Sequence, residues 1–237
     1  MKPMCRLIYF VFAAALFASC SKINGEGDIV TEERTATGYT MISLAMDATV
    51  SYTQDSVYSL VLNAQQNILD VIETHVEGDR LIIEYEDHVK IGKHDPIVIE
   101  VRAPDVRMLD ISGTGQINMF GLWNVNSAGL NISGSGNINL AAVNARSISS
   151  NISGSGNIDV AWGVASYCDL NISGSGNIDM LYVETDTAYA NISGSGNIMI
   201  TVFDYLDATI SGSGNIQYRG NPDVDLHVSG SGTVIHL

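Results

Sequence analysis

Residues 109–237 alternate apolar and polar side chains with a period of two, and this alternation is itself repeated along the chain. A phrase centred on one apolar residue recurs seven times, at Ile111, Ile132, Ile152, Ile172, Ile192, Ile210 and Val228. The intervals are 21, 20, 20, 20, 18 and 18 residues, and four copies read NISGSGNI. A period near 20 residues predicts a solenoid in which each coil stacks on its neighbours.

Even and odd positions of the phrase differ in polarity. Positions −2, +6 and +8 from the central residue are mostly apolar, and positions +2 and +4 are glycine in every copy. Odd positions are mostly Ser, Thr, Asn or Asp. We therefore expect an all-β parallel β-helix with even positions inside and polar ladders outside, about 4.8 Å apart. The rule for parallel crossovers predicts right-handed coiling, and the segments that vary between copies predict external turns.

The first 19 residues differ from the rest of the chain. Lys2 and Arg6 precede an apolar run from Leu7 to Phe17, and the sequence LFASC then ends at Cys20. This order is typical of a secretion signal, and LFASC resembles the lipobox of bacterial lipoproteins. We predict that residues 1–19 are a lipoprotein signal peptide and that Cys20 carries the lipid. An ordinary signal peptide with an incidental cysteine is the alternative.

The remaining chain reads as a tether followed by one domain. Residues 20–28 form the lipidated cysteine and tether, and residues 29–237 form a single β-solenoid domain. Residues 29–108 are its irregular N-terminal part and residues 109–237 its seven regular repeats. The segment NAQQNILDVIE predicts one short helix, capped by Asn63.

Composition narrows the function classes. Acidic residues outnumber basic ones by 26 to 11, for a formal charge of −15, while 46% of residues are hydrophobic. The hydrophobic content supports a large core. The charge argues against nucleic acid as a partner, because phosphates require clustered Lys and Arg.

The glycine-rich phrase does not predict a cofactor site. A dinucleotide-binding loop needs a third glycine and a following helix, and neither is present. Asp159 and Asp179 could hold a cation or serve a carbohydrate-active enzyme, but no lysine follows Lys93. The scattered histidines do not form a metal-ligand pattern. We expect no cofactor, no metal and no enzymatic activity, with a carbohydrate-active enzyme as the rival hypothesis.

Outward polar and aromatic residues are the candidates for ligand contact. The candidates are Asn137, Asn157, Asn177, Asn197, Asp159, Asp179, Trp162 and Tyr182. Aromatic residues gather in the variable segments, where either ligand binding or ordinary packing explains them. These aromatic residues are Trp123, Trp162, Tyr167, Tyr182, Tyr189, Phe203 and Tyr205.

Several segments together resemble one known family. The leader, GEGDIVTEERTATGYTMISLAMDATVSYTQ, NILDVIETHVEGDRLIIEY, IVIEVRAPDVRMLDISGTG and the ISGSGNI copies are similar to the putative autotransporter adhesin head GIN domain family. The resemblance covers residues 25–237. It implies a β-helical fold in a secreted or surface lipoprotein of Gram-negative bacteria, and it brings no catalytic residues.

These observations predict an outer-membrane or cell-surface lipoprotein that acts as a non-enzymatic binding or adhesion module. Its partners would be the membrane, through the lipid anchor, and a glycan or protein ligand. A structural envelope protein is a further alternative. The last repeat leaves an open strand edge, which predicts either self-association through that rung or a cap supplied by the N-terminal half.

Overall fold

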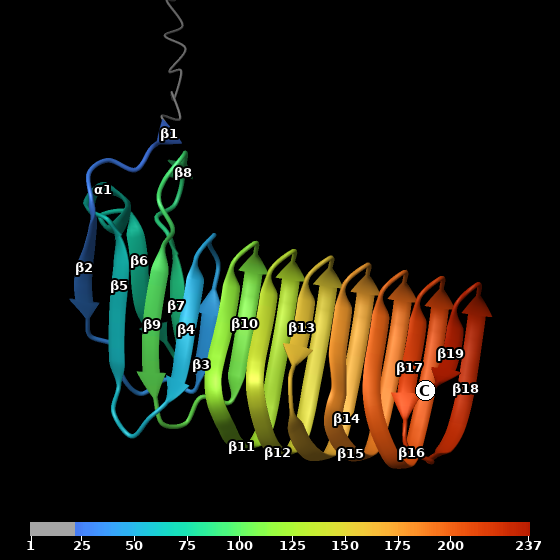
Figure 1. The fold of residues 1–237 in the computed structure, drawn as a ribbon. Helices are drawn as coiled ribbons and strands as arrows, with labels where there is room; N and C mark the ends of the chain where they lie inside the picture. Colours follow the sequence, from blue (N-terminus) through green and yellow to red (C-terminus); the bar gives the residue numbers. More distant parts are fainter. Residues whose placement is uncertain (1–21) are drawn as a thin grey trace, which may run out of the picture.

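The computed structural model describes residues 22–237 and shows an elongated stack of β-coils with a mixed group of strands at one end (Figure 1). The predicted all-β parallel β-solenoid with about 20 residues per coil is confirmed. None of the helices within residues 22–237 is long and apolar enough to cross a membrane. The predicted signal peptide and Cys20 lie outside the described residues.

The regular solenoid begins at β10 and pairs in parallel throughout. Equivalent residues of successive phrases are direct partners, as Ile132 is with Ile152. Its strands are β10 (Met108–Gly113), β11 (Gln116–Gly134), β12 (Asn137–Gly154), β13 (Asn157–Val160), β14 (Gly163–Gly174), β15 (Asn177–Gly194), β16 (Asn197–Gly212), β17 (Asn215–Arg219), β18 (Asp223–Gly230) and β19 (Thr233–His236).

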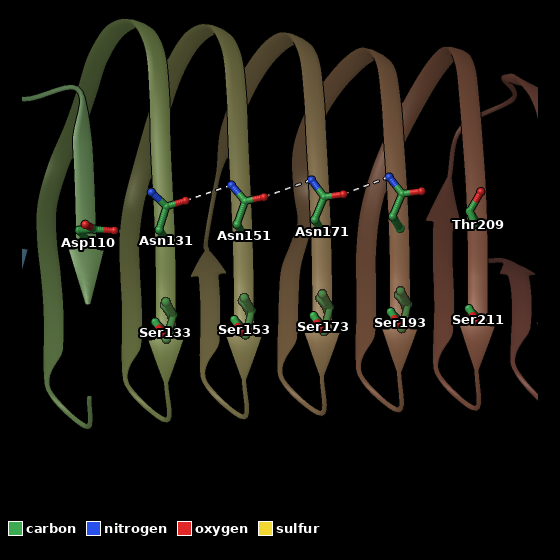
Figure 2. A pocket seen from close by; sticks show the side chains of 15 residues that line it. Asp110, Asn131, Ser133, Asn151, Ser153, Asn171, Ser173, Ser193, Thr209 and Ser211 are labelled. Atoms are coloured by element: carbon green, nitrogen blue, oxygen red, sulfur yellow. Dashed lines mark hydrogen bonds between the residues drawn. The ribbon is translucent and has the colours of Figure 1, made fainter. Parts of the chain in front are cut away.

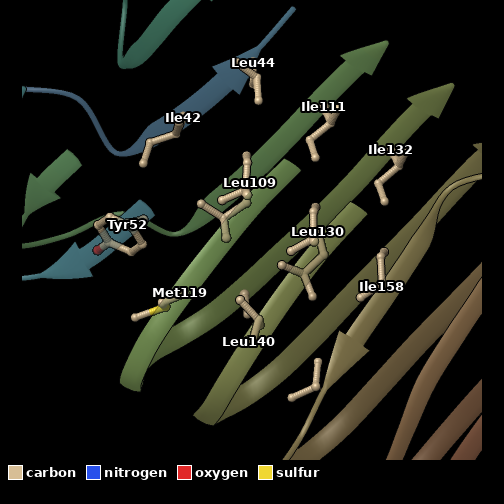
Figure 3. Close-up of a cluster of buried hydrophobic side chains, with 14 of the residues drawn as sticks. Ile42, Leu44, Tyr52, Leu109, Ile111, Met119, Leu130, Ile132, Leu140 and Ile158 are labelled. Atoms are coloured by element: carbon tan, nitrogen blue, oxygen red, sulfur yellow. The ribbon is translucent and has the colours of Figure 1, made fainter. Parts of the chain in front are cut away.

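Each coil has two main faces joined by a sharp corner. The first face consists of β10, β18 and the last residues of β11, β12, β14, β15 and β16. The second face consists of β13, β17, β19 and the first residues of β11, β12, β15 and β16. The Ser-Gly pair at positions +3 and +4 separates them. Ile and Leu side chains from both faces fill the interior (Figure 3), and most of them are fully buried.

The variable segments were expected to be external turns, and this expectation was wrong. In most coils they are curved continuations of the strands, paired in parallel from coil to coil; Val143 pairs with Gly163, and Gly163 with Val183. The strand is interrupted at residues 161–162 and 220–222. Ladder hydrogen bonds satisfy their backbone as well as a turn would. The 21-residue interval is absorbed by a register shift between Met119 and Leu122.

The N-terminal part is ordered and closes one end of the solenoid. Two of its strands extend the two faces in parallel: β3 pairs with β10, and β4 with β11. Antiparallel pairs β2–β5, β5–β9 and β6–β7 then end the stack. The elements are β1 (Lys22–Ile23), β2 (Ile29–Arg34), β3 (Met41–Leu44), β4 (Thr49–Gln54), β5 (Ser59–Gln65), α1 (Gln66–Leu69), β6 (Ile72–Glu77), β7 (Arg80–Tyr85), β8 (Lys90–Ile91) and β9 (Val98–Ala103).

The predicted helix is shorter than expected and is not capped by Asn63. Helix α1 has four residues, and Gln65 precedes it without a side-chain capping bond. Asn63 belongs to β5, where pairing with β2 and β9 outweighs its capping preference. Ile68 and Leu69 are fully buried, so tertiary packing supports the short helix.

The two ends of the solenoid are far apart in Figure 1. The hypothesis that the N-terminal half caps the last rung is therefore wrong, since the N-terminal strands pair with β10 and β11 instead. All strand pairs described above lie within residues 22–237 and enclose one continuous hydrophobic core. We expect this part of the chain to fold on its own.

Candidate binding groove

Asparagine side chains form a hydrogen-bonded column on the outside of the first face (Figure 2). They occupy position −1, so strand alternation points them away from the core. Asn151 donates its Nδ2 to Oδ1 of Asn131 over 3.0 Å, and Asn171 and Asn191 repeat this bond over 3.2 and 3.1 Å. Each accepting oxygen takes one bond in the column and keeps a lone pair for a ligand.

A parallel column of serines lies two residues further along each strand. Its members are Ser133, Ser153, Ser173, Ser193 and Ser211 (Figure 2). Within residues 22–237 none of these hydroxyls has a hydrogen-bond partner. The column therefore offers repeated, unused donors and acceptors, about 4.8 Å apart.

A shallow groove of about 530 Å³ runs between the two columns and crosses several coils. Asn and Ser side chains form its sides, and the intervening isoleucine positions form its floor. Among its lining residues the single carboxylate is that of Asp110, which is ion-paired with Arg80. The groove is thus long and uncharged over most of its length, and its exposed surface is mostly apolar with hydrogen-bonding groups along its sides.

Three tyrosines lie beside the Asn column toward the C-terminal end. Tyr189 precedes Asn191 by two residues and so points to the same side of the first face. Its ring centroid is 5.6 Å from that of Tyr167 and 6.1 Å from that of Tyr205. Loss of hydration, followed by the nearby carboxylates, raises the pKa of Tyr167 and Tyr205. The phenols of Tyr167 and Tyr205 therefore stay neutral at physiological pH, and all three rings can stack on a ligand.

The predicted Asn137, Asn157, Asn177 and Asn197 lie on the second face, on the opposite side of the coil. They also form a column, bonded over 2.8–2.9 Å, which continues to Asn215 and ends at the hydroxyl of Thr233. Asp159 and Asp179 occupy the neighbouring column as direct register partners. Burial, and then the charge of Asp179, raise the pKa of Asp159.

Trp162 and Tyr182 lie at the curved segment that follows the second face. Their side chains are 54% and 59% exposed and share a hollow of about 250 Å³ with Arg219. The Arg219 guanidinium carbon lies 5.5 Å from the Tyr182 ring centroid, within the range of a cation–π contact. Trp123, from the same set of aromatic residues, is instead fully buried.

One group in the described part of the chain has the composition of a metal site, although the sequence predicted none. Glu73, His75 and Glu84 lie on β6 and β7, with ligand atoms within 4.8 Å of one another. The two glutamates are direct cross-strand partners, and both glutamates and the histidine reach the outer surface. The group lies on the N-terminal strands, and solvent-exposed acidic groups of this kind are common without a metal.

The alternation predicted that the Asn and Ser columns of the first face lie outside the core, but these residues were not among the predicted ligand contacts. The signal was present at positions −1 and +1 of the phrase, where Ser occurs at +1 in all seven copies. Alternation identifies an outward column on both faces and cannot tell which face is hollowed. That difference depends on how the strands curve, which is a tertiary property.

Comparison with known proteins adds a family and several similar structures. A family model described as "Putative auto-transporter adhesin, head GIN domain" matches residues 38–222. No curated protein gives a match.

Solved structures from Bacteroides and Parabacteroides share the fold. A putative adhesin from Bacteroides fragilis NCTC 9343 has a TM-score of 0.85 at 21% identity, covering 91% of this chain and 100% of its own. A structure from Parabacteroides distasonis ATCC 8503 described as a putative lipid binding protein has a TM-score of 0.76 at 26% identity, covering 92% and 100%. A putative adhesin from Parabacteroides merdae ATCC 43184 has a TM-score of 0.76 at 23% identity, covering 91% and 99%.

Proposed function

Because the chain belongs to the family described as "Putative auto-transporter adhesin, head GIN domain", we propose that it is a non-enzymatic binding module of the bacterial cell surface. The family description supports surface binding, and the long groove, with hydrogen-bonding groups along its sides, supports recognition of an extended ligand. The groove is the observation that carries the proposal.

The module is held at the membrane by lipid on Cys20. The sequence pattern before Cys20 supports this part of the proposal. In a Gram-negative host, the wild-type protein should incorporate labelled fatty acid and fractionate with the outer membrane. Cys20→Ser should remove the label and release the protein. Equal labelling of wild type and Cys20→Ser would contradict the anchor.

The ligand class that best matches the groove is a neutral glycan chain. Sugar hydroxyls can donate to the free oxygens of the Asn column and exchange hydrogen bonds with the Ser column. The flat rings of Tyr167, Tyr189 and Tyr205 offer stacking surfaces at its border. Acidic residues along the same face, such as Asp169 and Asp207, oppose an anionic glycan.

Two other ligand or reaction classes fit less well. A lipid chain would match the mostly apolar surface of the groove, but it would leave the Ser hydroxyls and Asn oxygens along the sides without partners, which costs free energy. Hydrolysis of a glycan would require two carboxylates on either side of the bond, but Asp159 and Asp179 are neighbours in one column of the second face. Binding to lipid vesicles and turnover of a glycan distinguish these two classes from glycan binding.

Binding of neutral and acidic polysaccharides to the chain from Ser21 to Leu237 tests the proposal directly. We expect binding of a neutral polysaccharide by calorimetry. The double substitution Ser153→Ala with Ser173→Ala should weaken it about tenfold, because each of the two lost hydrogen bonds contributes roughly 0.5–1 kcal/mol. Tyr189→Ala should weaken it by a similar factor through lost stacking.

A matched control is Ser155→Ala with Ser175→Ala. These serines lie two residues further along, at the sharp corner and outside the groove lining, so affinity should not change. Preferential binding to phosphatidylcholine vesicles would overturn the glycan proposal. Loss of binding with Trp162→Ala but not with Tyr189→Ala would move the site to the curved segment. Turnover of any glycan that disappears with Asp159→Ala or Asp179→Ala would show an enzyme.

A further inference from the structure

The last coil of the solenoid exposes side chains that every other coil buries. Val224, Leu226 and Val228 of β18 point inward but are 36%, 52% and 46% exposed. Their register partners in β16 are Leu206, Ala208 and Ile210, all at most 1% exposed. All eight residues of β18 are exposed, so both its apolar side chains and one edge of its backbone lack a neighbour.

The N-terminal end shows how this fold covers an edge when it is closed. There α1 and the antiparallel strands lie over the core, and the outer strand β2 carries the charges of Glu32, Glu33 and Arg34. Charged side chains on edge strands are a common protection against pairing. The inward positions of β18 carry no charge. Its outer positions include Asp223 and Asp225, but the strand contains no Lys, Arg or Pro.

We propose that the last coil pairs with the last coil of a second copy, forming a closed dimer in which β18 runs antiparallel to its own copy, centred on Leu226. A closed pair is favoured over an open stack, because the antiparallel strands at the N-terminal end offer no parallel rung to continue the coils.

The residues of β18 are self-complementary in this register. With Leu226 opposite its own copy, Val224 lies opposite Val228 of the other copy on the core side. On the outer side, Asp225 already lies 3.5 Å from His227 of its own strand. In the dimer it also lies opposite His227 of the other copy, so two further polar pairs form. A shift by one residue would place inward side chains opposite outward ones and lose both sets of contacts.

The same two-fold axis is perpendicular to both faces and brings β19 opposite its own copy. The axis also keeps the two Asn–Ser grooves on the same side of the dimer. The proposed dimer is independent of the ligand that the grooves bind. The exposed apolar side chains of the last coil would then become a continuous interior, as they are between all the other coils.

Analytical ultracentrifugation of the chain from Ser21 to Leu237 tests the proposal. We expect a dimer at micromolar concentration. Leu226→Lys should weaken it at least about 100-fold, because it places two ammonium groups at the centre of the interface. The matched control Leu122→Lys changes a similarly exposed leucine, 45% exposed, in the curved segment and should leave the dimer intact.

An outward charge pair tests the register without touching the core. Asp225→Lys should weaken the dimer about tenfold, and adding His227→Glu should restore it, because the two substituted side chains then attract each other across the interface. A wild type that is still monomeric at about 100 μM would overturn the dimer itself, because pairing weaker than this has little energetic weight. A dimer unaffected by Leu226→Lys, or a double variant as weak as Asp225→Lys, would overturn the proposed pairing.

Discussion

Gly174→Ala is expected to lower the free energy of unfolding by at least about 4 kcal/mol, or to prevent folding. Gly174 sits at the sharp corner with φ of +135°, a conformation that L side chains rarely adopt. A Cβ atom there would also lie 2.2 Å from the carbonyl oxygen of Gly154 in the preceding coil. Because this neighbour is backbone, relief requires the coils to move apart.

Gly113→Ala separates the two causes. Gly113 holds the same position in the first phrase with φ of +129°, yet nothing lies within 4 Å of the point that its Cβ would occupy, because the pairing with β3 ends at Leu44, opposite Ile111. Its substitution should cost only the backbone strain, about 1–3 kcal/mol. Thermal unfolding should show Gly174→Ala melting several degrees below Gly113→Ala. Equal melting temperatures would mean that coil spacing does not require glycine at this corner.

Trp123→Ala is expected to lower the free energy of unfolding by about 3–5 kcal/mol. Trp123 is one of the largest fully buried side chains. Its indole Nε1 donates to the carbonyl oxygen of Val106 over 2.9 Å and so joins β11 to the connection between β9 and β10. Its loss would leave both a cavity and an unpaired carbonyl where the N-terminal strands meet the solenoid. Urea unfolding followed by circular dichroism measures the change.

Trp162→Ala is the matched substitution, since these are the two tryptophans of the chain. Trp162 is 54% exposed, and its side chain makes no hydrogen bond within residues 22–237. The free energy of unfolding should change by less than about 0.5 kcal/mol. Comparable losses for the two variants would contradict the burial that the structure assigns to Trp123.

The two tryptophans differ in burial, and this difference could not be predicted from the sequence. Both lie in variable segments, and alternation within the phrase does not reach them. A register shift after Met119 places Trp123 opposite Val143, on the core side. Since one residue of shift exchanges the two sides of a strand, a single insertion decides whether an aromatic side chain is buried or available to a ligand.

The structure of the repeats could be predicted from the sequence because their local pattern specifies it. Each phrase contains its own alternation, and every coil meets a nearly identical neighbour, so one copy predicts the environment of the next. The buried Ile column, the outer Asn and Ser columns and the glycine corner all followed from that rule. The N-terminal part has no repeat, and its antiparallel pairs link residues distant in sequence, as Ile29 pairs with Gln65.

The sequence by itself determined the solenoid, its period and the side of the strand on which each phrase residue lies, because these depend on a residue and its equivalent 18 to 21 positions away. Tertiary structure alone decided that the first face is grooved, that the variable segments are strands, and that the N-terminal part closes the end opposite β18. These features depend on strand curvature and on pairing between unlike segments. NISGSGNI specifies a rung, whereas the surface formed by the stacked rungs arises only when the whole chain has folded.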